Sequence, residues 1–144
     1  MFNNILMVCV GNICRSPTAE FLMQAALPEK NVSSAGIAAV QGHDMDATAR
    51  AVAEARGHHF AEHTARQLTR SLCQQAELIL VMEPRHRDEV GRLAPEALGK
   101  TFLLGKWLGD KAIPDPYRKS TDVFEFVFEQ IEAGVNAWQQ KLNQ

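Results

Sequence analysis

The stretch VCVGNICRSPT, residues 8–18, decides how this chain begins to fold. It starts inside the apolar run Ile5–Val10, which shows no alternation of apolar and polar residues. Such a run is typical of a strand that is covered on both faces, as in a parallel sheet. Ser16 and Pro17 then fit the cap and the first position of a helix over 17–26. The stretch therefore predicts a strand, a tight loop and a helix in direct succession.

The rest of the chain repeats this alternation of strands and helices. Further strands are predicted where short apolar segments precede loops, at 32–35, 78–82 and 101–104. Further helices are predicted from their start and stop signals and apolar spacing, at 46–56, 84–93 and from Phe124 to Leu142, the last after a cap at Ser120 or Asp122. Right-handed connections then give an open α/β sheet with helices on both faces and any site at the carboxyl ends of the strands.

The composition fits one compact domain over residues 1–144. The chain is 46% hydrophobic, and its 15 basic and 17 acidic side chains give a net charge of -2. This balance argues against a nucleic-acid partner held mainly by phosphate contacts. The N-terminus lacks a positive region and its apolar run is too short to insert in a membrane, so a cytoplasmic protein is expected. The cysteines Cys9, Cys14 and Cys73 are too few for a disulfide scaffold.

The loop between the first strand and the first helix is suited to an anion. Backbone N–H groups of residues 10–16 and the helix start can converge on one phosphate-sized space. Gly11 and Asn12 favour such a loop because both residue types tolerate positive φ angles. The nucleotide-binding patterns GxxxxGK[ST] and GxGxxG are absent. The loop is therefore interpreted as a cradle for a phosphoryl group.

Two side chains of this loop and one distant carboxylate suggest catalysis. A helix N-terminus and the Arg15 guanidinium both favour the thiolate form of Cys9, which makes it a candidate nucleophile. Arg15 can donate two parallel hydrogen bonds to phosphoryl oxygens. An alcohol leaving group also needs a proton donor, and Asp115, between two prolines in IPDPY, is the candidate. Without these neighbours, Cys9 would be interpreted as a buried strand residue and Asp115 as part of a surface turn.

These motifs resemble those of the low-molecular-weight protein tyrosine phosphatases over nearly the full length of the chain. The matching segments are VCVGNICRSPTAE near the N-terminus, SSAG at 33–36, HTARQLT at 63–69, LILVMEPRHRDEV at 78–90 and PDPYRKS at 114–120. The resemblance implies a single-domain, four-stranded parallel sheet in the order 2-1-3-4, with the phosphate loop after the first strand. It also implies hydrolysis of phosphotyrosine in proteins.

The resemblance implies a role for each residue of the phosphate loop. Cys9 would attack phosphorus to give a phosphocysteine, and Asp115 would protonate the leaving phenolate and then activate water. Arg15 and the loop would bind the phosphoryl oxygens; the remaining loop residues are Val10, Gly11, Asn12, Ile13, Cys14 and Ser16. Ser16 would donate a hydrogen bond to the sulfur. No cofactor and no metal ion are expected.

Residues outside the catalytic set match supporting positions of the family. Asn12, Ser34 and His63 would brace the phosphate loop through hydrogen bonds. Ile13, Val40 and Tyr117 would form the wall that contacts a phosphotyrosine ring. Cys14 would be a redox partner that forms a disulfide with Cys9 under oxidation. Cys73 is expected to be structural, and the histidine and arginine clusters 58–59 and 85–87 are expected on solvated faces.

The details point to the bacterial branch of the family. Val40 stands where vertebrate members place a second aromatic residue, and Tyr117 is followed by Arg118. This branch is paired with the membrane tyrosine autokinases of capsule and exopolysaccharide export, so the cytosolic part of such a kinase is the expected partner. The protein itself is expected to be a monomer or a weak dimer.

Two other functions remain open from the sequence. A thiol-dependent arsenate reductase uses a similar loop, but it needs a relay of further cysteines, and only Cys73 lies outside the loop. A phosphoryl carrier or anion-binding module would hold the phosphoryl group without hydrolysing it. Asp115 argues against a carrier, because a carrier does not require an acid for a leaving group.

Overall fold

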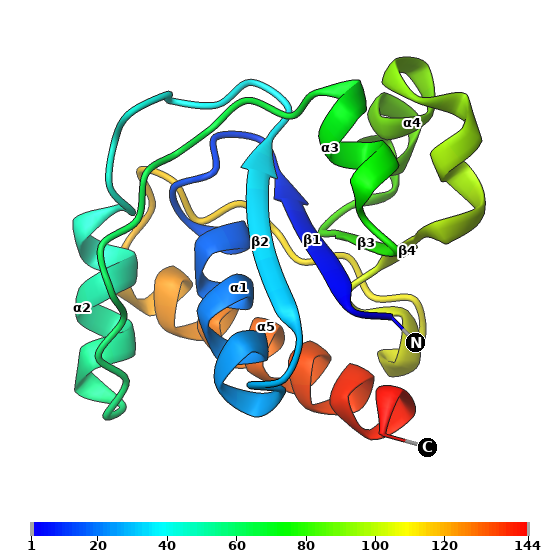
Figure 1. Cartoon of the computed structure of the whole chain (residues 1–144). Coiled ribbons are helices and arrows are strands. Elements are labelled where there is room, and N and C mark those ends of the chain that lie inside the picture. The colour runs from blue at the N-terminus through cyan, green and yellow to red at the C-terminus, as the bar shows by residue number, and fades with distance from the viewer. Residues whose placement is uncertain (1, 144) are drawn as a thin grey trace.

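The computed structural model describes residues 2–143 and contains an open, four-stranded parallel sheet (Figure 1). The strands are in the order β2-β1-β3-β4, with bounds Asn4–Cys9 for β1, Asn31–Gly36 for β2, Leu78–Val81 for β3 and Thr101–Leu103 for β4. All three neighbouring pairs of strands are parallel. The predicted sheet and its strand order are therefore confirmed.

Helices cover both faces of this sheet, as predicted. Their bounds are Arg15–Ala26 for α1, Ala47–Ala55 for α2, Arg70–Gln75 for α3, Pro84–Leu93 for α4 and Thr121–Leu142 for α5, with short 3-10 turns η1 at Pro95–Lys100 and η2 at Lys106–Leu108. In Figure 1, α1, α2 and α5 lie on one side of the strands, and α3 and α4 lie on the other. No helix within residues 2–143 combines the length and the apolar character needed to cross a lipid bilayer.

The uniformly apolar first strand separates two hydrophobic cores. Ile5, Met7 and Cys9 belong to the core beneath α1 and α5, whereas Leu6 and Val8 belong to the core beneath α3 and α4. Alternate residues of a strand point to opposite faces of a sheet, so a central strand between two helical layers must be apolar at every position. This alternation also directs the side chain of Cys9 toward α1.

Helix α1 begins earlier than the sequence predicts, and Ser16 is not its cap. The helix starts at Arg15, and its N-cap residue Cys14 makes no side-chain capping bond. The Ser16 hydroxyl instead contacts Cys9 and Asn12 inside the protein. A Ser-Pro pair resembles a capped helix start in any sequence, and only the folded loop shows that this hydroxyl has other partners. Of the two predicted caps of α5, Ser120 occupies the N-cap position without a side-chain capping bond, and Asp122 lies in the first turn.

The segment after β2 is tied to the phosphate loop by three backbone hydrogen bonds. The N–H groups of residues 37, 38 and 40 donate to the carbonyl oxygens of residues 9, 10 and 11, at 2.9, 2.9 and 3.0 Å. Gly36 begins this contact, and a Cβ atom placed on it would lie 2.5 Å from the carbonyl oxygen of Val10. The backbone at Gly36 and the backbone of the phosphate loop therefore lie too close together for any side chain at position 36.

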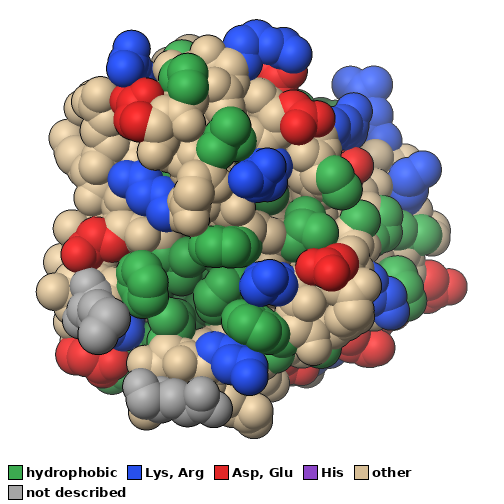
Figure 2. Space-filling model, turned by 90° about the vertical axis from the view of Figure 1, so that its right-hand side faces the viewer, with side chains coloured by type: hydrophobic (Ala, Val, Ile, Leu, Met, Phe, Trp, Pro, Cys, Tyr) green, Lys and Arg blue, Asp and Glu red, His purple; other side chains and the backbone are tan. Residues whose placement is uncertain are grey.

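Another face of the molecule carries an aromatic cluster beside lysines. Figure 2 shows hydrophobic side chains gathered on this face with Lys and Arg side chains around them. Trp107, which is 41% exposed, lies edge-on to Trp138 with 5.5 Å between ring centroids. Lys106 and Lys141 lie over the Trp107 ring at 5.1 and 4.6 Å from its centroid. The contacts of Trp107 with Lys141 and Trp138 join η2 to the end of α5.

The close approach at Gly36 generates a prediction about stability. We expect Gly36→Ala to lower the free energy of unfolding by about 1–3 kcal/mol, because the new methyl group forces β2 away from the phosphate loop. Chemical denaturation followed by circular dichroism measures this loss. The control is Gly99→Ala, since nothing lies within 4 Å of a Cβ placed there. Equal free energies of unfolding for the two variants would show that the phosphate loop accommodates the methyl group without loss of stability.

Candidate active site

The phosphate loop connects β1 directly to α1 at the carboxyl end of the sheet. Cys9 is the last residue of β1 and is 3% exposed, and Arg15 is the first residue of α1 and is 1% exposed. Asn12 has a φ angle of 59°, as its predicted place in a tight loop suggested. Gly11 has no such angle, and a Cβ placed on it would meet Ile13 and Val40 at an ordinary 3.6 Å, so the predicted need for glycine here is wrong.

The loop forms one wall of a cavity of about 180 Å³. The predicted nucleophile, cation and acid all line it, as do the three predicted wall residues: Cys9, Arg15, Asp115, Ile13, Val40 and Tyr117. Asp115 and Tyr117 come from the loop after η2, and Val40 comes from the loop after β2. Residues far apart in the sequence therefore meet in one place, at the end of the sheet where the α/β order predicts a site.

Hydrogen bonds link the Cys9 sulfur to Asn12 through Ser16. The Ser16 Oγ lies 2.9 Å from the Cys9 Sγ, and the Asn12 amide nitrogen donates to the same oxygen at 2.8 Å. Since Ser16 accepts from Asn12, its own hydroxyl hydrogen is free to point at the sulfur. The backbone N–H of Ser16 also donates to Cys9 Sγ, at 3.4 Å. Two donors of Ser16, its hydroxyl and its backbone N–H, can therefore reach the sulfur.

The orientation of the Asn12 side chain is fixed by its other partners. Its oxygen accepts from the backbone N–H of Arg66 at 2.9 Å, and its nitrogen also donates to Ser34 Oγ at 2.9 Å. Ser34 in turn donates to Glu20 Oε1 at 2.6 Å. His63 Nε2 lies 2.7 Å from the backbone carbonyl oxygen of Asn12. The predicted group of Asn12, Ser34 and His63 is therefore together in the structure.

Glu20 and Arg66 take part in this network, although sequence reasoning missed both. The contribution of Arg66 to Asn12 is a backbone N–H, which leaves no trace in residue type. Glu20 lies in the segment SPTAE, and nothing in that segment indicates a contact with Ser34 on another element. A carboxylate one helical turn after Ser16 was the only available signal.

The Arg15 guanidinium is buried among oxygen atoms. Its Nη1 donates to Glu83 Oε2 at 2.5 Å and to the carbonyl oxygen of Ile113 at 2.8 Å. Its Nη2 lies 3.9 Å from Asp115 Oδ2. Glu83, which follows β3, is a further residue that the sequence did not reveal. Partial burial opposes its ionisation, but the hydrogen bond and charge of Arg15 outweigh burial and hold the Glu83 pKa below its usual value.

The prediction that residues 85–87 lie on a solvated face is wrong for His86. This histidine is 1% exposed, while Arg85 and Arg87 are exposed. Its Nδ1 accepts from the backbone N–H of Glu83 at 3.3 Å, and within the described residues its Nε2 has no hydrogen-bond partner. Burial, followed by the charge of Arg15, lowers the His86 pKa to about 4. The ring therefore packs as a neutral capping group of α4.

The other two cysteines are buried thiols. Burial, then the charge of Asp46 and of Cys9, raises the pKa of Cys14 far above its ordinary value. Burial likewise raises the pKa of Cys73, which is fully buried on α3. Both side chains therefore stay protonated at neutral pH. Within residues 2–143, no group of three His, Cys, Asp or Glu side chains is arranged to hold a metal ion.

Comparison with known proteins identifies the family. The family profile described as low molecular weight phosphotyrosine protein phosphatase matches residues 4–144. The chain is 50% identical over 143 residues to the low molecular weight protein-tyrosine-phosphatase Wzb of Escherichia coli K12, which covers 99% of this chain and 97% of Wzb. It is 49% identical over 138 residues to the probable low molecular weight protein-tyrosine-phosphatase AmsI of Erwinia amylovora, which covers 96% of each.

Solved structures agree with this assignment. Vibrio vulnificus Wzb in complex with benzylphosphonate superposes with a TM-score of 0.95 at 48% identity, covering 98% of this chain and 99% of that one. The YwlE arginine phosphatase from Geobacillus stearothermophilus has a TM-score of 0.91 at 33% identity, covering 97% and 92%. The chain belongs to the low-molecular-weight protein tyrosine phosphatase family. It is a protein-tyrosine phosphatase similar to Wzb and AmsI.

The buried histidine beside the site predicts a dependence of stability on pH. The His86 pKa drops from 6.5 to about 4 on folding, so the unfolded chain binds more protons between these values. Its contribution to stability is present above pH 6.5 and is lost as the pH falls toward 4. We expect the native protein to lose about 2 kcal/mol more than His86→Gln between pH 7 and pH 5.

Denaturant titrations at the two pH values measure this difference. His59→Gln is the matched control, because His59 is exposed, and it should lose as much stability as the native protein. An unchanged pH dependence in His86→Gln would mean that other groups cause the acid sensitivity.

Proposed function

We propose that the protein hydrolyses phosphotyrosine in proteins through a phosphocysteine intermediate. The observation that carries this proposal is that Cys9, Arg15 and Asp115 line one small cavity although they come from three different elements. A nucleophile, an oxyanion clamp and an acid are the three groups that this reaction requires. Cys9, which ends β1, lines this cavity and is otherwise buried.

In the first step, the Cys9 thiolate attacks phosphorus, an S–P bond forms and the P–O bond to tyrosine breaks. Arg15 and the backbone N–H groups of the loop bind the phosphoryl oxygens as negative charge builds up on them. The Arg15 guanidinium is already immobilised by Glu83 and by the Ile113 carbonyl, so little freedom is lost when a phosphoryl group binds. The hydrogen bond from Ser16 stabilises the sulfur anion before attack and after departure.

Asp115 is proposed to protonate the leaving phenolate and then to remove a proton from water. Its Oδ1 accepts from the backbone N–H of Tyr117 at 3.0 Å, and Pro114 and Pro116 restrict the backbone around it. Its other oxygen faces Arg15 at 3.9 Å. The second step breaks the S–P bond, transfers the phosphoryl group to water and restores the thiolate.

The wall of the cavity favours an aromatic substrate. Ile13, Val40 and Tyr117 give it apolar surface, and Tyr117 is 44% exposed beside the opening. These side chains can contact the two faces of a phenyl ring, and the one carboxylate among the described residues that line the cavity, Asp115, is assigned to the leaving group. We therefore propose phosphotyrosine rather than phosphoarginine as the substrate, although an arginine phosphatase shares the fold.

Two alternative functions fit the structure less well. A thiol relay, as in an arsenate reductase, would need Cys73 to reach the loop, but Cys73 is fully buried within the α3 core. A phosphoryl carrier would have no use for Asp115 beside Arg15. Both observations support hydrolysis over these alternatives. We also propose that Cys14 forms a disulfide with Cys9 under oxidation.

The partner that we propose is the cytosolic part of a membrane tyrosine autokinase of capsule or exopolysaccharide export. The proposal rests on the resemblance of the loop containing Val40 and of the pair Tyr117-Arg118 to the bacterial branch. Arg118 lies over the Tyr117 ring, 5.3 Å from its centroid, and keeps positive charge beside the opening. Such a charge suits a phosphorylated, acidic segment of a partner.

The acid role of Asp115 predicts a difference between leaving groups. We expect Asp115→Ala to lower kcat by roughly 10²-fold on phosphotyrosine, because the departing phenolate needs a proton. The loss should be much smaller on 2,4-dinitrophenyl phosphate, whose leaving group is stable as an anion. Asp88→Ala, an exposed carboxylate on α4, is the matched control. Equal losses on both substrates would remove Asp115 from the acid role.

The nucleophile is tested with Cys9→Ser. We expect turnover to vanish while inorganic phosphate still binds, since Arg15 and the loop N–H groups remain; calorimetry and activity assays measure the two effects. Cys73→Ala is the control that removes a thiol elsewhere and retains activity.

The proposed partner is tested by capture with the same variant. Mass spectrometry of phosphotyrosine proteins captured by Cys9→Ser should find the autokinase. Capture of other proteins alone would reject this partner and leave the phosphatase activity standing.

A further inference from the structure

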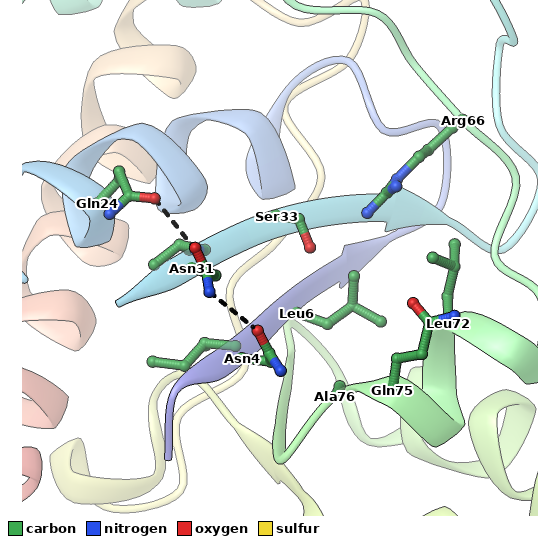
Figure 3. A pocket seen from close by; sticks show the side chains of 11 residues that line it. Asn4, Leu6, Gln24, Asn31, Ser33, Arg66, Leu72, Gln75 and Ala76 are labelled. Carbon is green, nitrogen blue, oxygen red and sulfur yellow. Dashed lines mark hydrogen bonds between the residues drawn. The ribbon is translucent and has the colours of Figure 1, made fainter. Parts of the chain in front are cut away.

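A second cleft lies along β1 and the edge strand β2, between α3 and Gln24 of α1. Its volume is about 510 Å³, and none of the residues that line it also line the active-site cavity. Figure 3 shows Leu6 of β1 and Ser33 of β2 at its floor, with Leu72 and Gln75 of α3 on one side and Arg66 above β2. The cleft is open because β2 carries the small polar Ser33 opposite Leu6 in the sheet register.

The lining of this cleft has two kinds of surface. Leu6, Leu72 and Ala76 give it an apolar side, and the amides of Asn4, Asn31 and Gln75 give it a polar rim. Among the described residues that line it, Arg66 alone carries a charge. This combination suits a small molecule with an apolar body, a few hydrogen-bonding groups and one negative charge.

The Arg66 guanidinium is available to such a molecule. Its Nε donates to the carbonyl oxygen of Ser34 at 2.8 Å, which fixes the side chain along β2. Within residues 2–143 it forms no ion pair with an acidic side chain, whereas the neighbouring Arg70 is paired with Glu96 at 3.1 Å. The Nη atoms can therefore donate two parallel bonds to a carboxylate or phosphate while Nε keeps its bond to Ser34.

Arg66 also touches the network that supports the Cys9 sulfur. Its backbone N–H donates to Asn12 Oδ1, and its carbonyl oxygen accepts from the N–H of Gly36 at 2.9 Å. Its side chain holds the carbonyl of Ser34, whose hydroxyl accepts from Asn12. An anion that immobilises Arg66 therefore acts on the bond that orients Asn12.

We propose that this cleft is an effector site for a small amphipathic anion. The apolar body of the ligand packs on Leu6 and Leu72, and its carboxylate or phosphate binds the Nη atoms of Arg66. Occupancy holds Arg66 against Ser34 and Asn12, and so keeps the phosphate loop in the arrangement that serves catalysis. The transmission to catalysis rests on the proposed role of that loop, whereas binding in the cleft does not.

Binding is tested with 2-naphthoate as the probe in the full-length protein. We expect its titration to shift the backbone amide NMR signals of Leu6, Ser33 and Leu72. Arg66→Ala should abolish these shifts, and Arg70→Ala should retain them, because the Arg70 side chain is paired outside the cleft. Shifts confined to the phosphate loop, or cleft shifts that survive in Arg66→Ala, would overturn the site.

Transmission is tested by the effect of the same probe on turnover of p-nitrophenyl phosphate. We expect kcat to rise by about fivefold at saturation, the low end of ordinary coupling between two sites. Ser33→Gln, which fills the cleft without touching the catalytic residues, should keep its basal kcat and lose this response. If the probe raises KM and leaves kcat unchanged, it acts at the active site. If NMR shows that the probe occupies the cleft while kcat stays unchanged, the coupling is rejected. Either result leaves the phosphatase activity intact.

Discussion

The chemistry of this protein depends on which way one amide points. The backbone N–H of Arg66 can only donate, so it fixes the oxygen of the Asn12 side chain toward itself. The nitrogen of Asn12 must then face Ser16 and Ser34, and it donates to both. The Ser16 hydroxyl hydrogen is then free to donate to the Cys9 sulfur, which lies 2.9 Å from the Ser16 oxygen. A donor from the loop between α2 and α3 thus sets the direction of a hydrogen bond at the end of β1.

Arg15 has an equivalent role on the other side of the cavity. Burying a guanidinium is costly unless its donors are satisfied, and here Glu83 and the Ile113 carbonyl satisfy them. Glu83 follows β3, and Ile113 lies in the loop after η2 that also carries Asp115. The same cation therefore joins the start of α1 to the loops that follow β3 and η2. Parallel strands place all of these loops at one edge of the sheet, so the fold makes this convergence possible.

Local patterns in the sequence predicted the parallel strands and three of the residues that line the cavity, Cys9, Arg15 and Asp115. These patterns are uniform apolar runs, a strand–loop–helix start and an acid between prolines. The strand order was predicted from the resemblance to the family. Prediction failed where a contact joins distant segments. Glu83 meets Arg15 across 68 positions, and Arg66 reaches Asn12 across 54 through its backbone. Ser16 looked like a helix cap and His86 like a surface residue, since neither neighbourhood reveals burial. Only the tertiary structure shows that these polar side chains are buried.

The loop also shows how two thiols in one short segment become chemically different. Cys9 receives hydrogen bonds from the hydroxyl and the backbone N–H of Ser16 and lies at the cavity, where Arg15 is close. Cys14 is buried, and Asp46 adds negative charge beside it, so its pKa rises. Helix α2 carries Asp46 at its N-cap, where the carboxylate is held by the N–H groups of Thr48 and Ala49. The raised pKa of the Cys14 thiol therefore follows from its burial and from a carboxylate that an element outside the loop holds in place.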